Sequence, residues 1–257
     1  MGAPRGVFET LRCDDGVPRF VERHLARLEH GARALALPWP PPADLRETLA
    51  TLAREHPRGS WRLRIALVVD ERGPVLAADA QPRADPPAPV VLWTAPEGSF
   101  LPSYGVKSME RSNHVRWRAE ARARDAWDAL LRDGRGAVLE ATVANFFLAL
   151  DGRLVTPPLD AGVLPGIVRA LLLEDIEREP LVVGGVSWPA EERCVDGAHL
   201  SRASEVLVTN ALVGVLGADA VSGVPRAGSG LPGGRGPVAR ELRARLERLA
   251  GEDHRDS

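Results

Sequence analysis

Residues 105–122 read GVKSMERSNHVRWRAEAR and contain Lys107, the single lysine of this chain of 257 residues. Lysine and arginine together number 33, so every other cation of this kind is an arginine. A lysine amine can lose its proton and attack a carbonyl group, whereas an arginine guanidinium stays protonated. The alternative is a surface lysine left by codon bias, and the residues around Lys107 decide between the two explanations.

The composition narrows the classes of function. A hydrophobic fraction of 44% and a formal net charge of −2 allow a sizeable core and indicate neither a nucleic-acid nor a membrane partner. No apolar run approaches the roughly 20 residues of a membrane helix. Cys13 and Cys194 form no CxxC pair, and the six histidines lack metal-ligand spacing. We therefore expect a cytoplasmic protein without a metal site.

The first part of the chain predicts a small α+β domain, residues 1–95. The stretch VFETLR alternates as a strand does, with Phe8 and Thr10 on one face and Val7, Glu9 and Leu11 on the other. Asp14–Gly16 predicts a hairpin turn. Further patterns predict helices over 22–35 and 44–54 and strands over 61–69 and 89–94.

Residues 96–106 are rich in Gly, Pro and Ser and predict an interdomain linker. Residues 107–257 then form the second domain. Its pattern predicts helices over 110–124, from 165–166 and from 237, and strands over 126–131, 137–142, 145–150, 154–156, 181–186 and 205–209. The predicted fold class is therefore α+β, with a small N-terminal domain and a larger, β-rich C-terminal domain.

A lysine directly after a linker lies where a cleft between two domains would place a reactive group. If its amine holds pyridoxal phosphate, the chain must also supply a carboxylate for the pyridine nitrogen and a binding site for the phosphate. Glu140 lies among apolar residues in VLEATVANFF, where a carboxylate needs a cationic partner. Gly166 opens a helix, whose free N–H groups suit a phosphate. Taken singly, these signals are weak, because a buried glutamate is more often part of a structural ion pair and Pro-Gly before a helix is common.

Four blocks follow one another in order: residues 105–122, Val138–Phe147 (VLEATVANFF), Val155–Arg169 (VTPPLDAGVLPGIVR) and Ala203–Val213 (ASEVLVTNALV). They resemble the class IV aminotransferase family, the fold-type IV pyridoxal phosphate enzymes. VFETLR and the helix after it are similar to the N-terminal domain of that family. The resemblance covers nearly the whole chain and implies a two-domain fold like that of D-amino acid aminotransferase, and a homodimer.

The resemblance also implies roles for single residues. Lys107 would hold pyridoxal 5'-phosphate as a Schiff base and later move the proton, and Glu140 would pair with the pyridine nitrogen. Arg64 would reach the phosphate, although a surface cation on an edge strand is the alternative. The rest of the phosphate site would be backbone at two turns, namely Gly166, Ile167, Val168, Asn210 and Ala211.

Within the family, several positions are similar to 4-amino-4-deoxychorismate lyase. Arg111 stands four residues after the lysine, as in the Lys-x-x-Asn-Arg pattern of lyases, although Glu110 replaces the asparagine. Ser112 stands where many transaminases have a tyrosine. Thr10 falls at a threonine that lyases place near the substrate, with an ordinary strand residue as the alternative. The remaining expected substrate contacts are Phe8, Arg12, Tyr104 and Arg111.

The expected reaction converts the small molecule 4-amino-4-deoxychorismate into p-aminobenzoate and pyruvate, for folate or other aminobenzoate-derived products. The alternatives are a transaminase that acts on branched-chain or D-amino acids with a 2-oxo acid acceptor, and a catalytically silent relative that binds a ligand. The chain begins close to VFETLR, as do short lyase modules fused to a synthase. Aminodeoxychorismate synthase is therefore an expected partner.

Overall fold

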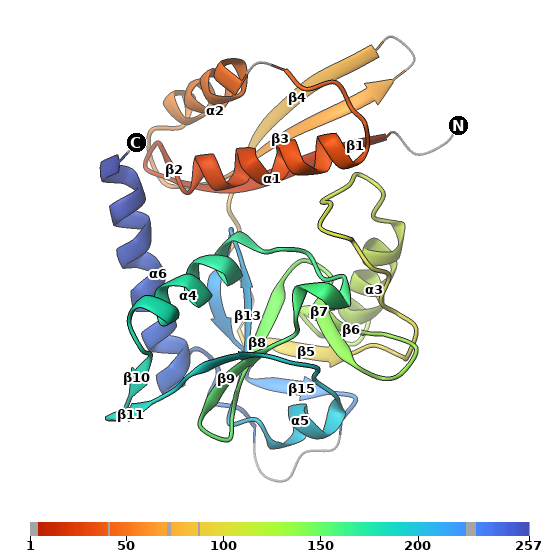
Figure 1. The fold of residues 1–257 in the computed structure, drawn as a ribbon, viewed down its shortest axis with the longest axis vertical. Coiled ribbons are helices and arrows are strands. Elements are labelled where there is room, and N and C mark those ends of the chain that lie inside the picture. Colours follow the sequence, from red (N-terminus) through yellow and green to blue (C-terminus); the bar gives the residue numbers. More distant parts are fainter. Residues whose placement is uncertain (1–4, 41, 71–72, 87, 225–229, 257) are drawn as a thin grey trace. The chain divides into compact units, whose positions relative to one another are not determined.

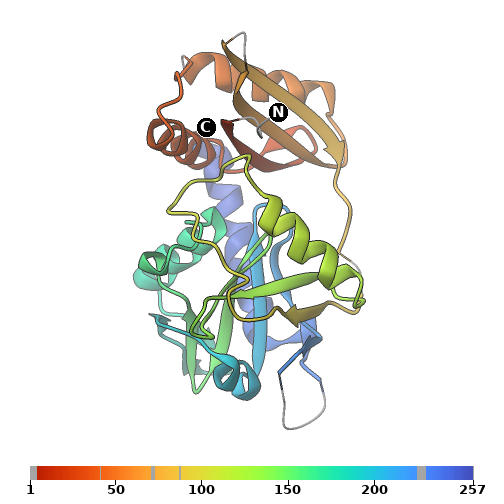
Figure 2. The same cartoon turned by 90° about the vertical axis from the view of Figure 1, so that its right-hand side faces the viewer.

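The computed structural model describes residues 5–40, 42–70, 73–86, 88–224 and 230–256. The chain forms two compact units, each with its own helices and sheets (Figures 1 and 2). Unit 1 contains the described residues of Met1–Asp85, Gly105–Arg111 and Leu249–Ser257, and unit 2 contains those of Pro86–Tyr104 and Ser112–Arg248. The α+β prediction is thereby confirmed.

The predicted boundary between residues 106 and 107 does not coincide with these units, because Lys107 belongs to unit 1. Its backbone is tied to the first strand, β1 (Arg5–Asp14): Phe8 N donates to Lys107 O at 3.1 Å, and Met109 N donates to Gly6 O at 2.8 Å. The last residues of the chain also belong to unit 1, where Phe20 N donates to Asp253 Oδ2 at 2.8 Å.

Unit 1 is a four-stranded antiparallel sheet in the order β2-β1-β3-β4. Its other strands are β2 (Val17–Pro18), β3 (Ser60–Asp70) and β4 (Gly73–Pro82), and its first two helices are α1 (Val21–Ala34) and α2 (Pro42–Glu55). The predicted hairpin is present, since Asp14 pairs with Val17 and both turn residues, Asp15 and Gly16, have positive φ. Strand β4 escaped prediction because most of its side chains are exposed or half-buried and follow no apolar alternation.

The helices cover one face of this sheet, as their apolar spacing predicted. On β1, Val7 and Leu11 face that core, with exposed fractions of 1% and 0%, and Glu9 lies between them at 0%. The core packs residues of α1, α2, β1 and β3 together, among them Leu25, Leu28, Leu45, Leu49, Leu63 and Ile65. The predicted apolar face of the first strand is therefore confirmed, and it carries one buried carboxylate.

Unit 2 contains two larger sheets, in the orders β12-β9-β8-β13-β14 and β15-β5-β6-β7. The first consists of β8 (Asn145–Leu150), β9 (Arg153–Thr156), β12 (Ala190–Glu192), β13 (Glu205–Asn210) and β14 (Gly214–Gly217), and the second of β5 (Val91–Thr94), β6 (Asp128–Arg132), β7 (Val138–Ala141) and β15 (Ala220–Ser222). The helices are α3 (Ser112–Arg122), α4 (Ile167–Arg178), α5 (Gly197–Arg202) and α6 (Pro237–Asp256), with 3-10 turns η1 (Leu159–Ala161) and η2 (Gly233–Arg235). Helix α6 runs on into unit 1 at Leu249.

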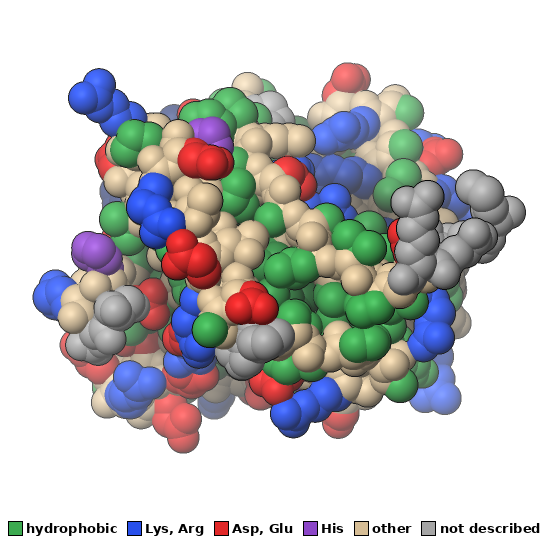
Figure 3. All heavy atoms as spheres, turned by 90° about the horizontal axis from the view of Figure 1, so that it is seen from above, with side chains coloured by type: hydrophobic (Ala, Val, Ile, Leu, Met, Phe, Trp, Pro, Cys, Tyr) green, Lys and Arg blue, Asp and Glu red, His purple; other side chains and the backbone are tan. Residues whose placement is uncertain are grey.

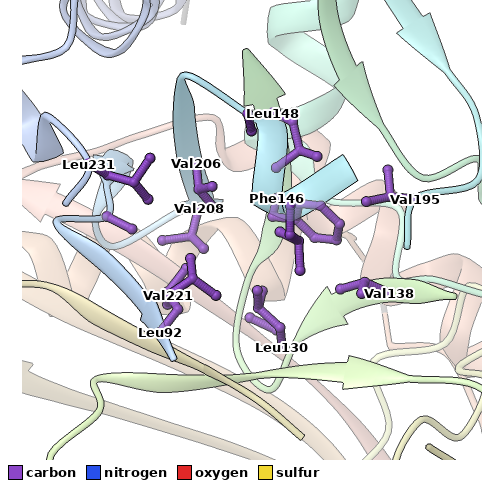
Figure 4. Packing of buried hydrophobic residues seen from close by; sticks show 14 of the residues in the cluster. Leu92, Leu130, Val138, Phe146, Leu148, Val195, Val206, Val208, Val221 and Leu231 are labelled. Carbon is purple, nitrogen blue, oxygen red and sulfur yellow. The ribbon is translucent and has the colours of Figure 1, made fainter. Parts of the chain in front are cut away.

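The core of unit 2 lies between these two sheets (Figure 4). Phe146 and Leu148 of β8 meet Leu130 of β6 and Val138 of β7, and all four have exposed fractions of 0%. Burial of such side chains stabilises the fold by about 1.5–3 kcal/mol each. Strands β7 and β8 are thus held rigidly, and they carry the predicted site residue Glu140 and its neighbour Asn145.

One predicted strand is wrong. Residues 181–186 form a tight hairpin of β10 (Val182–Val183) and β11 (Val186–Ser187), not a single strand. Gly184 and Gly185 make the turn with φ of 60° and 79°, a region that glycine enters at little cost because it has no Cβ. A pair of glycines inside an apolar run is a hairpin signal, and it outweighs the run itself.

The face shown in Figure 3 carries basic and acidic side chains of both signs among neutral and hydrophobic ones. No helix in the described part of the chain is long and apolar enough to cross a membrane.

Candidate active site

Lys107 lies beside β1 and is not a free surface lysine. Its side chain is 15% exposed, and its Nζ lies 3.6 Å from Glu9 Oε2. The same Nζ lies 4.9 Å from the centre of the Phe8 ring. An antiparallel bridge between Val7 and Ser108 continues the hydrogen bonds of this segment to β1. The backbone thus fixes Lys107 along a strand, and two side chains of that strand surround its amine.

Glu9 is the centre of a buried charge network. Its carboxylate lies 2.7 Å from His24 Nδ1 and accepts hydrogen bonds from Arg27, from Nε at 2.7 Å and from Nη2 at 2.8 Å. Burial alone would raise the pKa of Glu9, but the charges of Lys107 and Arg27 and the hydrogen bonds from Arg27 hold that pKa well below its ordinary value. Glu9 is therefore a stable anion in the interior of unit 1.

The pKa of Lys107 is lowered to about 8, chiefly by burial. Glu9 opposes this shift, because an anion favours the charged amine, and Arg27 and Arg111 add to it by repulsion. At pH 7 roughly a tenth of such an amine is unprotonated, several hundred times more than for an ordinary lysine. Lys107 is therefore suited to nucleophilic and proton-transfer chemistry near neutral pH.

Three cations surround the ring of Phe8. The guanidinium groups of Arg64 and Arg111 lie 4.7 Å and 5.7 Å from its centre, and Lys107 is the third. Arg64 Nη2 donates to Met109 Sδ at 3.1 Å, whereas its buried Nε has no hydrogen-bond partner among the described residues. Sulfur is a weak acceptor, so Arg64 keeps donor capacity for an anion.

Thr10 joins this group, because it is the Cα partner of Arg64 across β1 and β3 and paired residues share a face of the sheet. The structure thus brings five predicted site residues together in unit 1. With the network around Glu9 they form what we name the lysine cluster: Phe8, Glu9, Thr10, His24, Arg27, Arg64, Lys107 and Arg111.

Two expected substrate contacts lie outside this cluster. Arg12 Nε forms an ion pair with Asp14 Oδ2 at 2.8 Å, and Arg19 binds the same oxygen at 2.8 Å. Arg12 lies on the same face of β1 as Phe8 and Thr10, but no hydrogen bond or ion pair between its side chain and the lysine cluster is recorded in the described part of the chain. Tyr104 belongs to unit 2 and is 79% exposed. Their roles as substrate contacts stay predictions.

Glu140 belongs to unit 2, where strand β7 buries it to an exposed fraction of 4%. Its Oε2 accepts a hydrogen bond from Leu164 N at 2.9 Å, and its Oε1 lies 3.9 Å from His114 Nε2. The sequence predicted a cationic partner for this carboxylate. Among the described residues, the groups recorded against it are a backbone N–H and a histidine ring, so the predicted cationic partner stays a prediction.

The start of α4 is built around a side chain of β8. Asn145 Nδ2 donates to Leu164 O at 2.9 Å. A Cβ added at Gly166 would lie 1.8 Å from Asn145 Oδ1, so only glycine fits here. Gly166 is the N-cap of α4, and no side chain of the described residues caps the helix. The N–H groups at Ile167 and Val168 therefore begin a helix of twelve residues with a positive end suited to an anion.

The loop after β13 lies next to this helix start. Thr209 of β13 pairs with Asn145 of β8, and its buried Oγ1 has no partner among the described residues. Asn210 Oδ1 accepts from Leu212 N and Val213 N, both at 2.9 Å, so Ala211 sits inside a side-chain-stabilised turn. We name Glu140, Asn145, Gly166–Val168 and Thr209–Ala211 the helix-start cluster.

Sequence reasoning missed Glu9, His24 and Arg27. The signal for Glu9 was available, since it is an acidic residue between Val7 and Leu11 on the apolar face of a strand, which is the cue that singled out Glu140. His24 and Arg27 lie three residues apart and therefore on one side of α1. Their role becomes visible only when α1 is packed against β1.

Comparison with known proteins identifies the family to which the chain belongs. A family model described as "Amino-transferase class IV" matches residues 6–221. A "Probable branched-chain-amino-acid aminotransferase" of Thermotoga maritima is 28% identical over 216 residues, which are 82% of this chain and 75% of that protein. An "Aminodeoxychorismate lyase" of Bacillus subtilis is 25% identical over 187 residues, 66% of this chain and 64% of that protein.

The fold also matches a solved structure, described as "A hypothetical aminotransferase from Mycobacterium tuberculosis, PLP-bound form". The TM-score is 0.79 at 21% identity, over 96% of this chain and 89% of that one. At this identity the likeness concerns the fold alone, and it confirms the predicted fold-type IV architecture. Since the family model spans most of the sequence, from the first strand to β15, the chain belongs to the class IV aminotransferase family.

Proposed function

We propose that this chain is a pyridoxal-phosphate-dependent lyase that converts 4-amino-4-deoxychorismate into p-aminobenzoate and pyruvate. The observation that carries the proposal is the lysine cluster, in which an amine of lowered pKa lies over the same ring as Arg64 and Arg111. The substrate carries two carboxylates, and guanidinium groups bind carboxylates through paired N–H donors. One reactive amine beside two arginines suits such a dianion.

The residues present fit pyridoxal phosphate. Lys107 supplies the amine, and the buried carboxylate of Glu140 suits a protonated pyridine nitrogen. The start of α4, the buried Oγ1 of Thr209 and the Nε of Arg64, all without a side-chain or hydrogen-bond partner among the described residues, suit a phosphate. Membership of the class IV aminotransferase family supports the same cofactor. When bound, the cofactor acts as an electron sink for the carbon that loses a proton.

The other functions fall to the chain itself. The unprotonated Lys107 Nζ accepts the proton from the amine-bearing ring carbon, and its pKa of about 8 suits both uptake and release near neutral pH. Leu164 N fixes the Glu140 carboxylate. The backbone of Gly166–Val168 and Asn210–Ala211 would hold the phosphate group, and Arg64 would be its side-chain cation. Phe8, Thr10, Arg12, Tyr104 and Arg111 are the proposed substrate contacts.

The lyase reaction balances without a second substrate. The ring carbon loses its proton, the C–O bond of the enolpyruvyl ether breaks, and the ring becomes aromatic as p-aminobenzoate. The released enolpyruvate takes up one proton at its methylene carbon and becomes pyruvate. No amino acceptor is consumed, which separates this reaction from a transamination.

A transaminase acting on branched-chain or D-amino acids is the second candidate. The match to the Thermotoga maritima aminotransferase favours it, since that match is longer and slightly more identical than the match to the lyase. A transaminase would use the same lysine but would need a 2-oxo acid to complete each turnover. The lowered pKa of Lys107 argues against a third candidate, a catalytically silent relative.

One experiment separates these candidates. The full chain, purified with added pyridoxal phosphate, is mixed with 4-amino-4-deoxychorismate and no 2-oxo acid, and p-aminobenzoate and pyruvate are measured. Equal amounts of both products support the lyase. Turnover of amino acids only when a 2-oxo acid is present contradicts it and supports the transaminase. Borohydride reduction followed by mass spectrometry checks that the cofactor is bonded to the peptide containing Lys107, and an unmodified peptide would support the silent relative.

Three further predictions belong to this proposal: a cytoplasmic location, a homodimer, and aminodeoxychorismate synthase as a partner that supplies the substrate. Sedimentation of the purified chain tests the dimer. Co-purification with the synthase from the same cells tests the partner, and cell fractionation tests the location.

A further inference from the structure

We propose that Glu9 is the docking anion of the Lys107 amine, which rests against Glu9 Oε2 whenever it is protonated and not bonded to the cofactor. The inference rests on the proposed function, because it presumes that this amine alternates between a bonded and a free state. It assigns Glu9 a positioning role: the carboxylate acts on the reaction through Lys107 and does not touch the substrate.

The geometry around Glu9 distinguishes a fixed anion from a releasable amine. Arg27 binds both carboxylate oxygens at 2.7 and 2.8 Å, and His24 Nδ1 lies 2.7 Å from Oε2. Lys107 Nζ stands off at 3.6 Å, which is an ion pair beyond hydrogen-bond length. Glu9 thus keeps its position when the lysine leaves, since its close partners hold it. The same anion is still there when the lysine returns.

The charges facing Lys107 explain why this anion matters. Arg27 comes from α1, Arg111 follows Lys107 on its own segment, and Arg64 comes from β3, while Glu9 of β1 is the single carboxylate that the structure records against Nζ in the described residues. His24 is fully buried, and burial lowers its pKa, so it orients Glu9 as a neutral ring near pH 7. Without Glu9, burial and the repulsion from nearby arginines would lower the pKa of Lys107 with no anion to oppose them.

Docking has a consequence for loading the cofactor. An ammonium held by Glu9 has no lone pair for a carbonyl, so Lys107 must lose its proton to solvent before it can attack. The docked form therefore protects the single lysine of the chain from stray aldehydes at acidic pH. Cofactor capture should therefore become faster as the pH rises through the pKa of Lys107, because the unprotonated fraction of the amine increases.

The chain offers a direct test, because a protein with one lysine has just two primary amines, Lys107 and the N-terminus. The full chain, freed of cofactor, is acetylated with trace acetic anhydride at a series of pH values, and mass spectrometry measures the rate at each amine separately. The midpoint is the pH at which the acetylation rate of an amine reaches half of its maximum. In the unaltered chain, the midpoint for Lys107 should lie well below the ordinary lysine value of about 10.4.

Glu9→Gln keeps the shape of the side chain but removes its charge and replaces one acceptor oxygen with an NH2 donor. The midpoint for Lys107 should fall further, and a fall of about one pH unit makes acetylation at pH 7 about five-fold faster. The matched control is Glu29→Gln on the same helix as Arg27, since Glu29 pairs with Arg33 at the surface and should leave the midpoint unchanged.

An unchanged or raised midpoint in Glu9→Gln overturns the proposal, because Glu9 would then only hold the strand in place. Glu9→Asp covers the case in which the glutamine variant fails to fold. Its shorter carboxylate stands further from Nζ, so a lowered midpoint supports docking and an unchanged one contradicts it. The test uses neither cofactor nor substrate, so its failure is distinguishable from failure of the product assay.

Discussion

The lysine cluster and the helix-start cluster differ in the groups that they offer to a ligand: the first offers charged side chains, and the second offers mainly backbone N–H groups. In the first, side-chain charges act on one another: Glu9 is an anion because three cationic or hydrogen-bonding side chains surround it. In the second, backbone groups dominate, since Leu164 N binds Glu140 and the free N–H groups come from a helix start. The first should therefore respond to pH and charge, and the second to changes of backbone space.

The strongest test of the lysine cluster is to keep its charge and remove its chemistry. Lys107→Arg retains a cation but cannot become a nucleophile at neutral pH. We expect turnover to fall by roughly 10³-fold or more, because both covalent binding and proton transfer are lost. Steady-state kinetics and borohydride trapping measure this. Lys107→Ala should match it, and residual trapping in either variant would contradict the role of Lys107.

Glu140 is the charged exception in the helix-start cluster. Glu140→Gln keeps an acceptor for Leu164 N, so the fold should persist, but the charge that suits a protonated ring nitrogen is gone. We expect kcat/KM to fall on the order of 10²-fold, as when one preorganised electrostatic partner is removed. Stopped-flow kinetics with a thermal unfolding control measures both properties. Full activity in a folded variant would show that backbone groups alone are sufficient there.

Backbone space is tested at Gly166. In Gly166→Ala the new Cβ would meet Asn145 Oδ1, so the start of α4 must shift. We expect the affinity for pyridoxal phosphate to fall about 10-fold and stability to fall by about 1–3 kcal/mol. The double variant with Asn145→Ala should regain part of the stability by removing the clash. Equilibrium dialysis and urea unfolding provide the measurements, and an unaffected single variant would contradict the crowding.

The smallest effect is a dependence of stability on pH from His24. Burial lowers the pKa of His24, so below its ordinary value of about 6.5 the unfolded chain binds a proton that the folded chain does not. Folding stability should drop by about 1 kcal/mol between pH 7 and 5.5. In His24→Gln this part should vanish, whereas the exposed control His30→Gln should retain it. The free energy of unfolding in urea at both pH values checks this.

Glu9 affects folding stability in a lower pH range than His24. Its pKa is held below the ordinary value, so its contribution to stability is present above about pH 4.3 and is lost only as the pH falls further.

Most of the regular elements could be predicted from the sequence, because their patterns are local. The helices that carry His24 and Ile167 and the strands that carry Glu9 and Glu140 all appear near their predicted residues. The exposed β4 and the short strands β12, β14 and β15 escaped, since two to four residues leave no period to detect and exposed side chains leave no apolar face.

Single residues of the candidate site could be selected from the sequence by their type and neighbours, as Lys107 and Glu140 were, and their roles stay predictions. The structure places Lys107 over the same Phe8 ring as Arg64. The network of Glu9, His24 and Arg27 was not predictable, because those residues meet only when α1 packs against β1. Ion pairs such as Arg12 with Asp14 likewise depend on side-chain directions that no period encodes.

The contact between Phe20 and Asp253 has a further consequence for anyone who shortens or extends this chain. Phe20 precedes α1 in a left-handed conformation with φ of 56°, and no side-chain cap is recorded for this helix among the described residues. The Asp253 carboxylate binds the N–H of Phe20 itself, just before the first turn. Deleting the last five residues would remove that hydrogen bond from the start of the helix that holds His24 and Arg27. A purification tag is therefore safer beyond residue 257 than in place of its final turn.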